Sequence, residues 1–187
     1  MRKTTFIRPF LVGLIALILM PLAANAQTPE AKILVVDFLA VNERSLVGQD
    51  VDAQLRQYQL ALEGRATELQ NEIKLEGETL VSQQSVLPPD VYQDQAIAYQ
   101  QKVQRANTEI EGKRNLLLKA AQAAQLEINR VVRPIIDNIM RDRGATMVVD
   151  NQFIYASMGS TGIDITNEVI TQLDIDLKNY AVRDPNQ

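Results

Sequence analysis

The chain has 187 residues, a formal net charge of −4, and neither histidine nor cysteine. Its length fits one domain and not clearly two. The missing residue types exclude disulfides, thiolate metal sites and the commonest general base. The acidic balance argues against nucleic acid as a partner, because phosphates favour surfaces dense in lysine and arginine.

Residues 1–26 have the pattern of a secretory signal peptide. Three basic residues open the segment, namely Arg2, Lys3 and Arg8. An apolar run over residues 10–22 and a small-residue cleavage site at Ala24, Asn25 and Ala26 follow. At about 13 residues the run is short for a membrane span, and an uncleaved anchor is the alternative. We expect export and cleavage before Gln27, which removes three basic residues and changes the charge from −4 to −7.

Residues 32–38 form a continuous apolar and β-branched run, which predicts a buried strand. Residues 42–52 are a polar entry into a long helix, and Ser45 and Asp50 are the candidate N-caps. From about Leu46 an apolar stripe recurs every three or four residues, the period of one face of an α-helix. This stripe continues to about Arg143 and organises the rest of the chain.

The long stripe is broken clearly only at Pro88 and Pro89, which cannot lie inside a helix. We therefore predict two long helices, ending near Gln84 and restarting at Pro89, that form an antiparallel hairpin. The second helix should be kinked by Pro134 and end at Gly144 as its C′ residue. No later segment is apolar enough to span a membrane.

The sequence after the hairpin predicts two strands and one short helix. Residues 145–149 and 153–157 read as a β-hairpin around a turn of Asp and Asn, and Thr166 is a candidate N-cap for an amphipathic helix. The first strand has no partner until these later strands. The fold class is therefore α+β, a small sheet with the long helical hairpin inserted between its first and second strands.

The interface between the two long helices is thinned by small residues, which bury little apolar area. The hairpin should therefore be flexible towards its tip and firm near the sheet, and association with other copies should supply the missing core. Acidic residues dominate the first helix and basic residues the second. The antiparallel pairing predicts three cross-helix contacts: Glu63 with Lys113 or Arg114, Glu72 with Arg105, and Glu76 with Lys102.

Candidate catalytic groups are few. Asp37, Asp150 and Asp164 lie at element ends, and we interpret them as capping residues and not as a carboxylate cluster. Ser157 has no base to activate it, and Tyr155 reads as a packing residue. We expect no enzyme and no catalytic, cofactor-binding or metal site.

An ordered set of segments resembles the OmpH/Skp family of periplasmic chaperones. The set covers the predicted mature chain and comprises the export signal and residues 32–37, 64–70, 144–150, 155–157 and 164–166. No single motif is highly specific, but their order is. The resemblance implies a homotrimer whose strands build a small β-body, with three helical hairpins projecting from it as tentacles. It also implies a periplasmic, ATP-independent holdase that keeps unfolded outer-membrane proteins from aggregating before membrane insertion, with no cofactor.

On this interpretation residues 27–45 and 132–187 form the β-body and residues 46–131 the arm. One feature departs from the family, in which the tips are basic: residues 72–94 contain Lys74 as their only basic residue beside five acidic ones. Lipid or lipopolysaccharide binding through the tip is therefore not expected. The alternative functions are a periplasmic coiled-coil adaptor that docks an envelope partner and a hydrolase with an acidic site.

Overall fold

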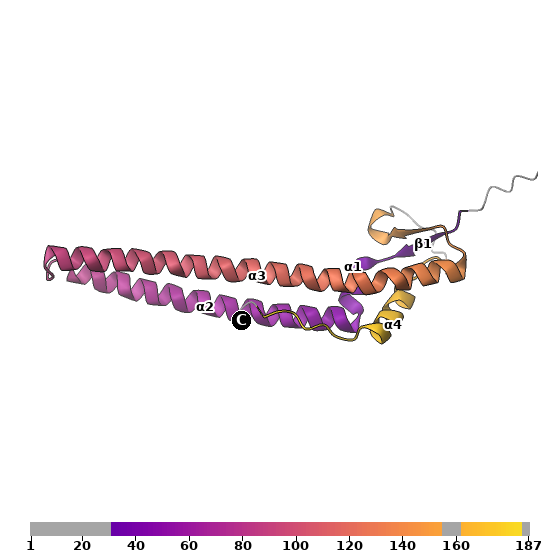
Figure 1. Cartoon of the computed structure of the whole chain (residues 1–187), viewed down its shortest axis with the longest axis horizontal. Helices are drawn as coiled ribbons and strands as arrows, with labels where there is room; N and C mark the ends of the chain where they lie inside the picture. The colour runs from indigo at the N-terminus through magenta and orange to yellow at the C-terminus, as the bar shows by residue number, and fades with distance from the viewer. Residues whose placement is uncertain (1–30, 155–161, 185–187) are drawn as a thin grey trace, which may run out of the picture. The chain divides into compact units, whose positions relative to one another are not determined.

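The computed structural model describes residues 31–154 and 162–184, which belong to one compact unit. The predicted signal peptide, Tyr155 and Ser157 lie outside these residues. Figure 1 shows the elements in chain order: β1 (Ile33–Val36), α1 (Phe38–Arg44), α2 (Leu46–Gln83), α3 (Pro89–Arg143), β2 (Met147–Asp150), the 3-10 turn η1 (Asn151–Phe153) and α4 (Thr166–Asp176). None of these described helices is long and apolar enough to cross a membrane.

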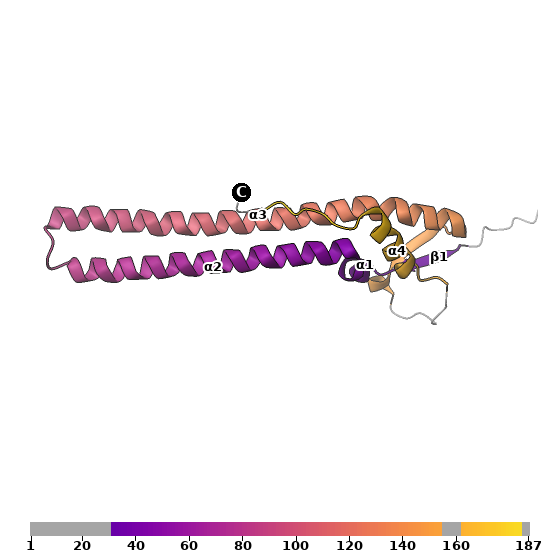
Figure 2. The same cartoon turned by 90° about the horizontal axis from the view of Figure 1, so that it is seen from below.

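Helices α2 and α3 form the predicted hairpin and run side by side in both views (Figures 1 and 2). The Ser45 hydroxyl caps α2 by accepting a hydrogen bond from the Gly48 N–H at 3.2 Å. Pro89 occupies the first position of α3, where its missing N–H costs nothing. Helix α3 continues through Pro134 without interruption and ends at Gly144, whose φ of 62° is left-handed.

Among the described residues the sheet has two strands, and these strands are parallel. Strand β1 pairs with β2 so that Ile33 is opposite Met147 and Val36 is opposite Asp150. On its other side β1 makes a single bridge, between Val35 and Asp164. Among the described residues β1 therefore has a neighbour on each side. In the sequence the whole helical hairpin lies between β1 and β2.

The predicted β-hairpin after α3 is wrong in its described part. Asn151–Phe153 forms the 3-10 turn η1 where a tight hairpin turn and the start of the next strand were predicted, and residues 155–157 of that strand lie outside the described residues. The Asp150 carboxylate stabilises this turn by accepting from the Gln152 N–H at 3.2 Å. The same residue types favour both structures, which explains why the turn chemistry alone misled the prediction.

The polar entry to the first long helix is also corrected, because residues 38–44 form a separate helix, α1. Asp37 caps α1 through a 2.9 Å hydrogen bond from the Ala40 N–H to its carboxylate. The predicted strand therefore ends at Val36 instead of Phe38. Helix α1 packs closely on the start of α2, where a Cβ added to Gly48 would meet the Asn42 carbonyl oxygen at 1.7 Å.

Thr166 is the first residue of α4 and not its N-cap. Its hydroxyl accepts a hydrogen bond from the Asp37 N–H at 2.9 Å, which links α4 to the end of β1. The Asp164 carboxylate instead accepts from the Thr166 N–H at 2.8 Å. The side chain of Thr166 is thus used in a contact between distant segments, which no local pattern predicts.

One hydrophobic core joins the sheet, α1, α4 and the adjoining ends of α2 and α3. Its fully buried side chains come from β1, α1, α4 and the start of α2, and include Leu34, Val36, Val41, Val47, Val169 and Leu173. Helix α3 adds a row of buried residues at helical spacing: Ala120, Ala124, Ile128, Val132, Ile135 and Ile139. The core therefore fixes one end of the hairpin, and the other end extends beyond it.

Candidate functional site

The hairpin divides into two parts with different burial, which we call the arm base and the distal arm. The arm base comprises residues 46–69 and 106–143. The distal arm comprises residues 70–105, and none of its side chains is buried. Leu69 in α2 and Ala106 in α3 are the last buried positions before it. Beyond them the two helices hold each other through half-buried and polar contacts only.

Large apolar side chains are exposed along the distal arm. They occur on both helices and at the tip: Leu75, Val81, Val86, Val91 and Ile97. Each of these side chains can make an apolar contact with another molecule, because burying apolar surface is favourable. Because these residues alternate with polar ones, the surface offers many separate weak contacts instead of one continuous patch.

Gly77 allows the two helices to approach within the distal arm. A Cβ added at this position would lie 2.8 Å from the Tyr99 hydroxyl oxygen and 3.2 Å from its ring. The Tyr99 side chain therefore lies against the bare backbone of α2. An open groove lined by Gly77, Tyr99, Leu80 and Val81 runs beside this contact.

Ion pairs connect the two helices where apolar burial is missing. The Lys102 ammonium group lies 2.6 Å from the Glu76 carboxylate, which confirms that predicted pair, and 3.6 Å from Glu72. Glu72 is thus placed against Lys102, about one turn from the expected Arg105. Arg65 donates to Glu109 at 3.1 Å. In this pair the basic residue lies in α2 and the acidic residue in α3, the opposite of the predicted pairs, and the sequence did not predict it.

The remaining cross-helix prediction concerned Glu63 and stays a prediction. Its expected partner Lys113 lies 3.7 Å from Glu109 in its own helix. Glu63 itself accepts a hydrogen bond from Gln59 at 3.1 Å.

The cross-helix pairs shift the pKa values of Glu109 and Lys102. The hydrogen bond from Arg65 lowers the pKa of the Glu109 carboxyl, and the nearby charges of Arg65 and Lys113 add to this effect. The hydrogen bond to Glu76 raises the pKa of Lys102. Both shifts show that the pairing favours the charged forms, although solvent screening keeps the contribution of such exposed pairs small.

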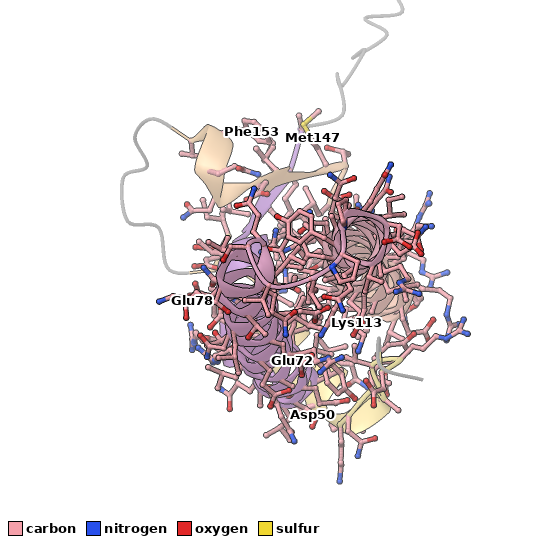
Figure 3. The ribbon with its side chains drawn as sticks, turned by 90° about the vertical axis from the view of Figure 1, so that its left-hand side faces the viewer. Asp50, Glu72, Glu78, Lys113, Met147 and Phe153 are labelled. Atoms are coloured by element: carbon pink, nitrogen blue, oxygen red, sulfur yellow. The ribbon has the colours of Figure 1, made fainter. Side chains whose placement is uncertain are left out.

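The tip of the arm is acidic. Residues 72–94 carry Glu72, Glu76, Glu78, Asp90 and Asp94, with Lys74 as the single basic residue. Glu72 and Glu78 are labelled in Figure 3. A surface of this charge repels anionic phosphate groups and does not suit an anionic membrane.

A second group of exposed apolar side chains lies at the sheet. Ile33 and Met147 are directly opposite each other in β1 and β2, and both are exposed. Phe153 follows β2 and is 77% exposed. Figure 3 shows Met147 and Phe153 on the sheet side of the unit, away from the C-terminal segment. Exposed apolar side chains grouped on one side of the unit can associate with another chain.

The three carboxylates at element ends act as caps, as predicted. Asp37 caps α1, Asp150 caps η1, and Asp164 accepts from the backbone at the start of α4. Within residues 31–154 and 162–184 no group of three acidic side chains is placed to hold a metal ion.

The comparisons with known proteins agree with this arrangement. The model of the OmpH family, described as outer membrane protein (OmpH-like), matches residues 32–173. A solved structure of an OmpH-like protein of Caulobacter crescentus, assigned as an outer membrane chaperone, has a TM-score of 0.72 at 18% identity, over 81% of this chain and 88% of that one. No curated protein matches the sequence. Since the family model spans most of the sequence, the chain belongs to the OmpH-like family.

Proposed function

We propose that the protein is an ATP-independent periplasmic holdase chaperone. In this role it binds unfolded outer-membrane proteins after export and prevents their aggregation before membrane insertion. The predicted signal peptide at residues 1–26 would deliver it to the periplasm. We further propose a homotrimer in which residues 27–45 and 132–187 form the joint β-body and residues 46–131 form one arm of each copy.

The observation that carries this proposal is the distal arm. It has no buried side chain, yet it presents large apolar residues on both helices. An unfolded client held by many such weak contacts gains affinity because each bound contact raises the effective concentration of the next. An arm with little core of its own can also change its shape to fit clients of different size.

The exposed apolar pair Ile33 and Met147, together with Phe153, supports association through the sheet. Two strands alone cannot shelter these side chains, and small cores commonly depend on oligomerisation. Copies joined at the sheet would place their arms around a shared space. Light scattering coupled to size exclusion should give three times the mass of one chain, and a mass of one chain would contradict the trimer.

An aggregation assay tests the holdase function. An outer-membrane β-barrel protein unfolded in urea is diluted into buffer with the protein and without ATP, and light scattering is followed. We expect suppression at equimolar trimer. A test variant replaces three distal apolar residues, Leu75, Val81 and Ile97, by serine. This variant should suppress aggregation less well, and its base should stay folded. Full aggregation at several-fold excess of the wild-type protein would contradict the proposal.

A further inference from the structure

The C-terminal segment after α4 lies along the arm and is bound to α2 through its backbone. Residues 177–184, which we call the strap, run back from α4 along the arm base (Figures 1 and 2). Val182 in the strap is only 4% exposed and belongs to the hydrophobic core. The strap follows residue 173, where the match to the family model ends.

The strap is bound through its backbone by three side chains of α2. The Tyr180 N–H donates to the Asp50 carboxylate at 3.2 Å, and the Gln54 amide donates to the Tyr180 carbonyl at 2.8 Å. The Val182 N–H donates to the Gln54 amide oxygen at 3.0 Å, and the Tyr58 hydroxyl donates to the Val182 carbonyl at 3.3 Å. All four backbone polar groups of these two strap residues are therefore satisfied by α2.

The three α2 residues form a ladder whose spacing suits an extended chain. Asp50, Gln54 and Tyr58 are four residues apart, which is about 6 Å along an α-helix. Alternate residues of an extended strand are about 6.6 Å apart. The ladder is fixed internally, because the Gln54 amide also donates to Asp50 at 2.9 Å. Figure 3 shows Asp50 beside the yellow C-terminal segment.

The three α2 side chains bind backbone groups, so these contacts do not depend on a particular sequence in the strap. Main-chain hydrogen bonds give affinity in strand-like peptide recognition, and the side chains at alternate positions give specificity. Here the inward side chains are Tyr180, which is half-buried, and Val182, which is buried, whereas Ala181 and Arg183 are exposed. The ladder thus accepts an extended segment with an apolar residue at every second position.

We propose that the α2 ladder is a docking site for extended client segments with this alternating pattern, and that the strap occupies it in the free protein. The proposal rests on the proposed holdase function. Strands of outer-membrane barrels alternate apolar and polar residues in this way. Because the strap is tethered, its effective concentration is in the range of about millimolar, so a client must compete with it. The strap therefore limits docking to segments that match the pattern well.

Fluorescence anisotropy with a labelled synthetic peptide tests the proposal on the full chain. The probe is a nine-residue peptide that alternates valine and threonine around a central tyrosine. The variant Val182→Asp places a charge at the buried strap position and should release the strap. The control Ala181→Asp adds the same charge at an exposed position. We expect Val182→Asp to bind the probe at least tenfold more tightly than either the wild-type protein or Ala181→Asp.

Two further arms test the ladder itself. Adding Gln54→Leu to Val182→Asp removes two of the four backbone contacts at similar side-chain volume, and should abolish the tenfold gain. A probe of the same composition with its valines grouped together should not show the gain. Equal binding by Val182→Asp and Ala181→Asp, a gain that survives Gln54→Leu, or equal binding of both probes would overturn the proposal. If circular dichroism shows that Val182→Asp is unfolded, Val182→Ser replaces it under the same criteria.

The aggregation assay separates this proposal from the holdase function. If the wild-type protein suppresses aggregation but Val182→Asp shows no gain in peptide binding, the docking site is wrong and the holdase function stands. If the wild-type protein suppresses no aggregation at several-fold excess, the holdase function is wrong. In that case the docking site is rejected as a client site as well.

Discussion

The arm base and the distal arm belong to the same two helices but are stabilised differently. At the base α3 buries a continuous apolar row against the sheet, α1, α2 and α4. In the distal arm no side chain is buried, and ion pairs such as Lys102 with Glu76 replace apolar packing. Most helical stability in proteins comes from tertiary packing, so the stability of the distal arm depends on continuity with the base. One hairpin can therefore combine a firm base with an adaptable end.

The largest expected difference compares one substitution in both regions of α3. Ile128 at the base is 3% exposed and Ile97 in the distal arm is 46% exposed. Ile128→Ala should lower the free energy of unfolding by about 2–5 kcal/mol, because it leaves a cavity in the core. Ile97→Ala should change it by no more than about 0.5 kcal/mol. Chemical denaturation at one protein concentration measures both, and similar losses would contradict the division of the arm.

Two glycines of α2 differ in the space around them. Gly48 at the base has the Asn42 carbonyl where a Cβ would lie, whereas Gly64 has nothing within 4 Å of that position. Gly48→Ala should destabilise the protein by about 1–3 kcal/mol through this clash. Gly64→Ala should stabilise it by about 1 kcal/mol, because alanine favours the helix. The midpoint temperature of thermal unfolding should fall for Gly48→Ala and rise for Gly64→Ala. A shift of both midpoints in the same direction would contradict the close packing of α1 on α2.

The smallest expected effect is a pH dependence of the paired helices near Arg65 and Glu109. Since the folded protein lowers the pKa of Glu109, this contribution to pairing is present above the ordinary glutamate pKa of about 4.3 and is lost as the pH falls through the lowered value. Because the chain has no native cysteine, spin labels can be attached at cysteines introduced at the exposed positions Ala61 and Glu111. The distance distribution between them should broaden in acid.

Arg65→Gln is the control for this pH effect. It removes the positive charge that pairs with Glu109 across the two helices, so the distribution should already be broad at neutral pH and change less in acid. An unchanged width between neutral and acidic pH in the wild-type protein would show that the pair does not hold the helices together.

The hairpin could be predicted because its ends carry strong local signals. Ser45, Pro89 and Gly144 are residue types that start or stop helices, and the apolar period between them is long. The parallel pairing of β1 with β2 is a long-range feature that no local pattern encodes. Helix α1 was missed because its first residues continue the apolar run of β1 and because it has only 7 residues.

The strap could not be predicted because its contacts use backbone groups. Nothing in the residue types of 177–184 indicates that Asp50, Gln54 and Tyr58 bind their main chain. The four-residue spacing of these polar side chains is visible in the sequence, but it equally describes a solvated helix face. Asp50 was considered only as a helix cap, and the structure shows that Ser45 has that role.

Amide hydrogen exchange along the arm tests whether the base is more stable than the distal arm. Mass spectrometry of the free protein can compare peptides from residues 116–139 with peptides from residues 75–100. If packing at the base and its absence in the distal arm set local stability, the base amides should exchange far more slowly than the distal ones, with a gradient between them. Uniform protection along both helices would contradict the account, because the distal arm would then be as firm as the base.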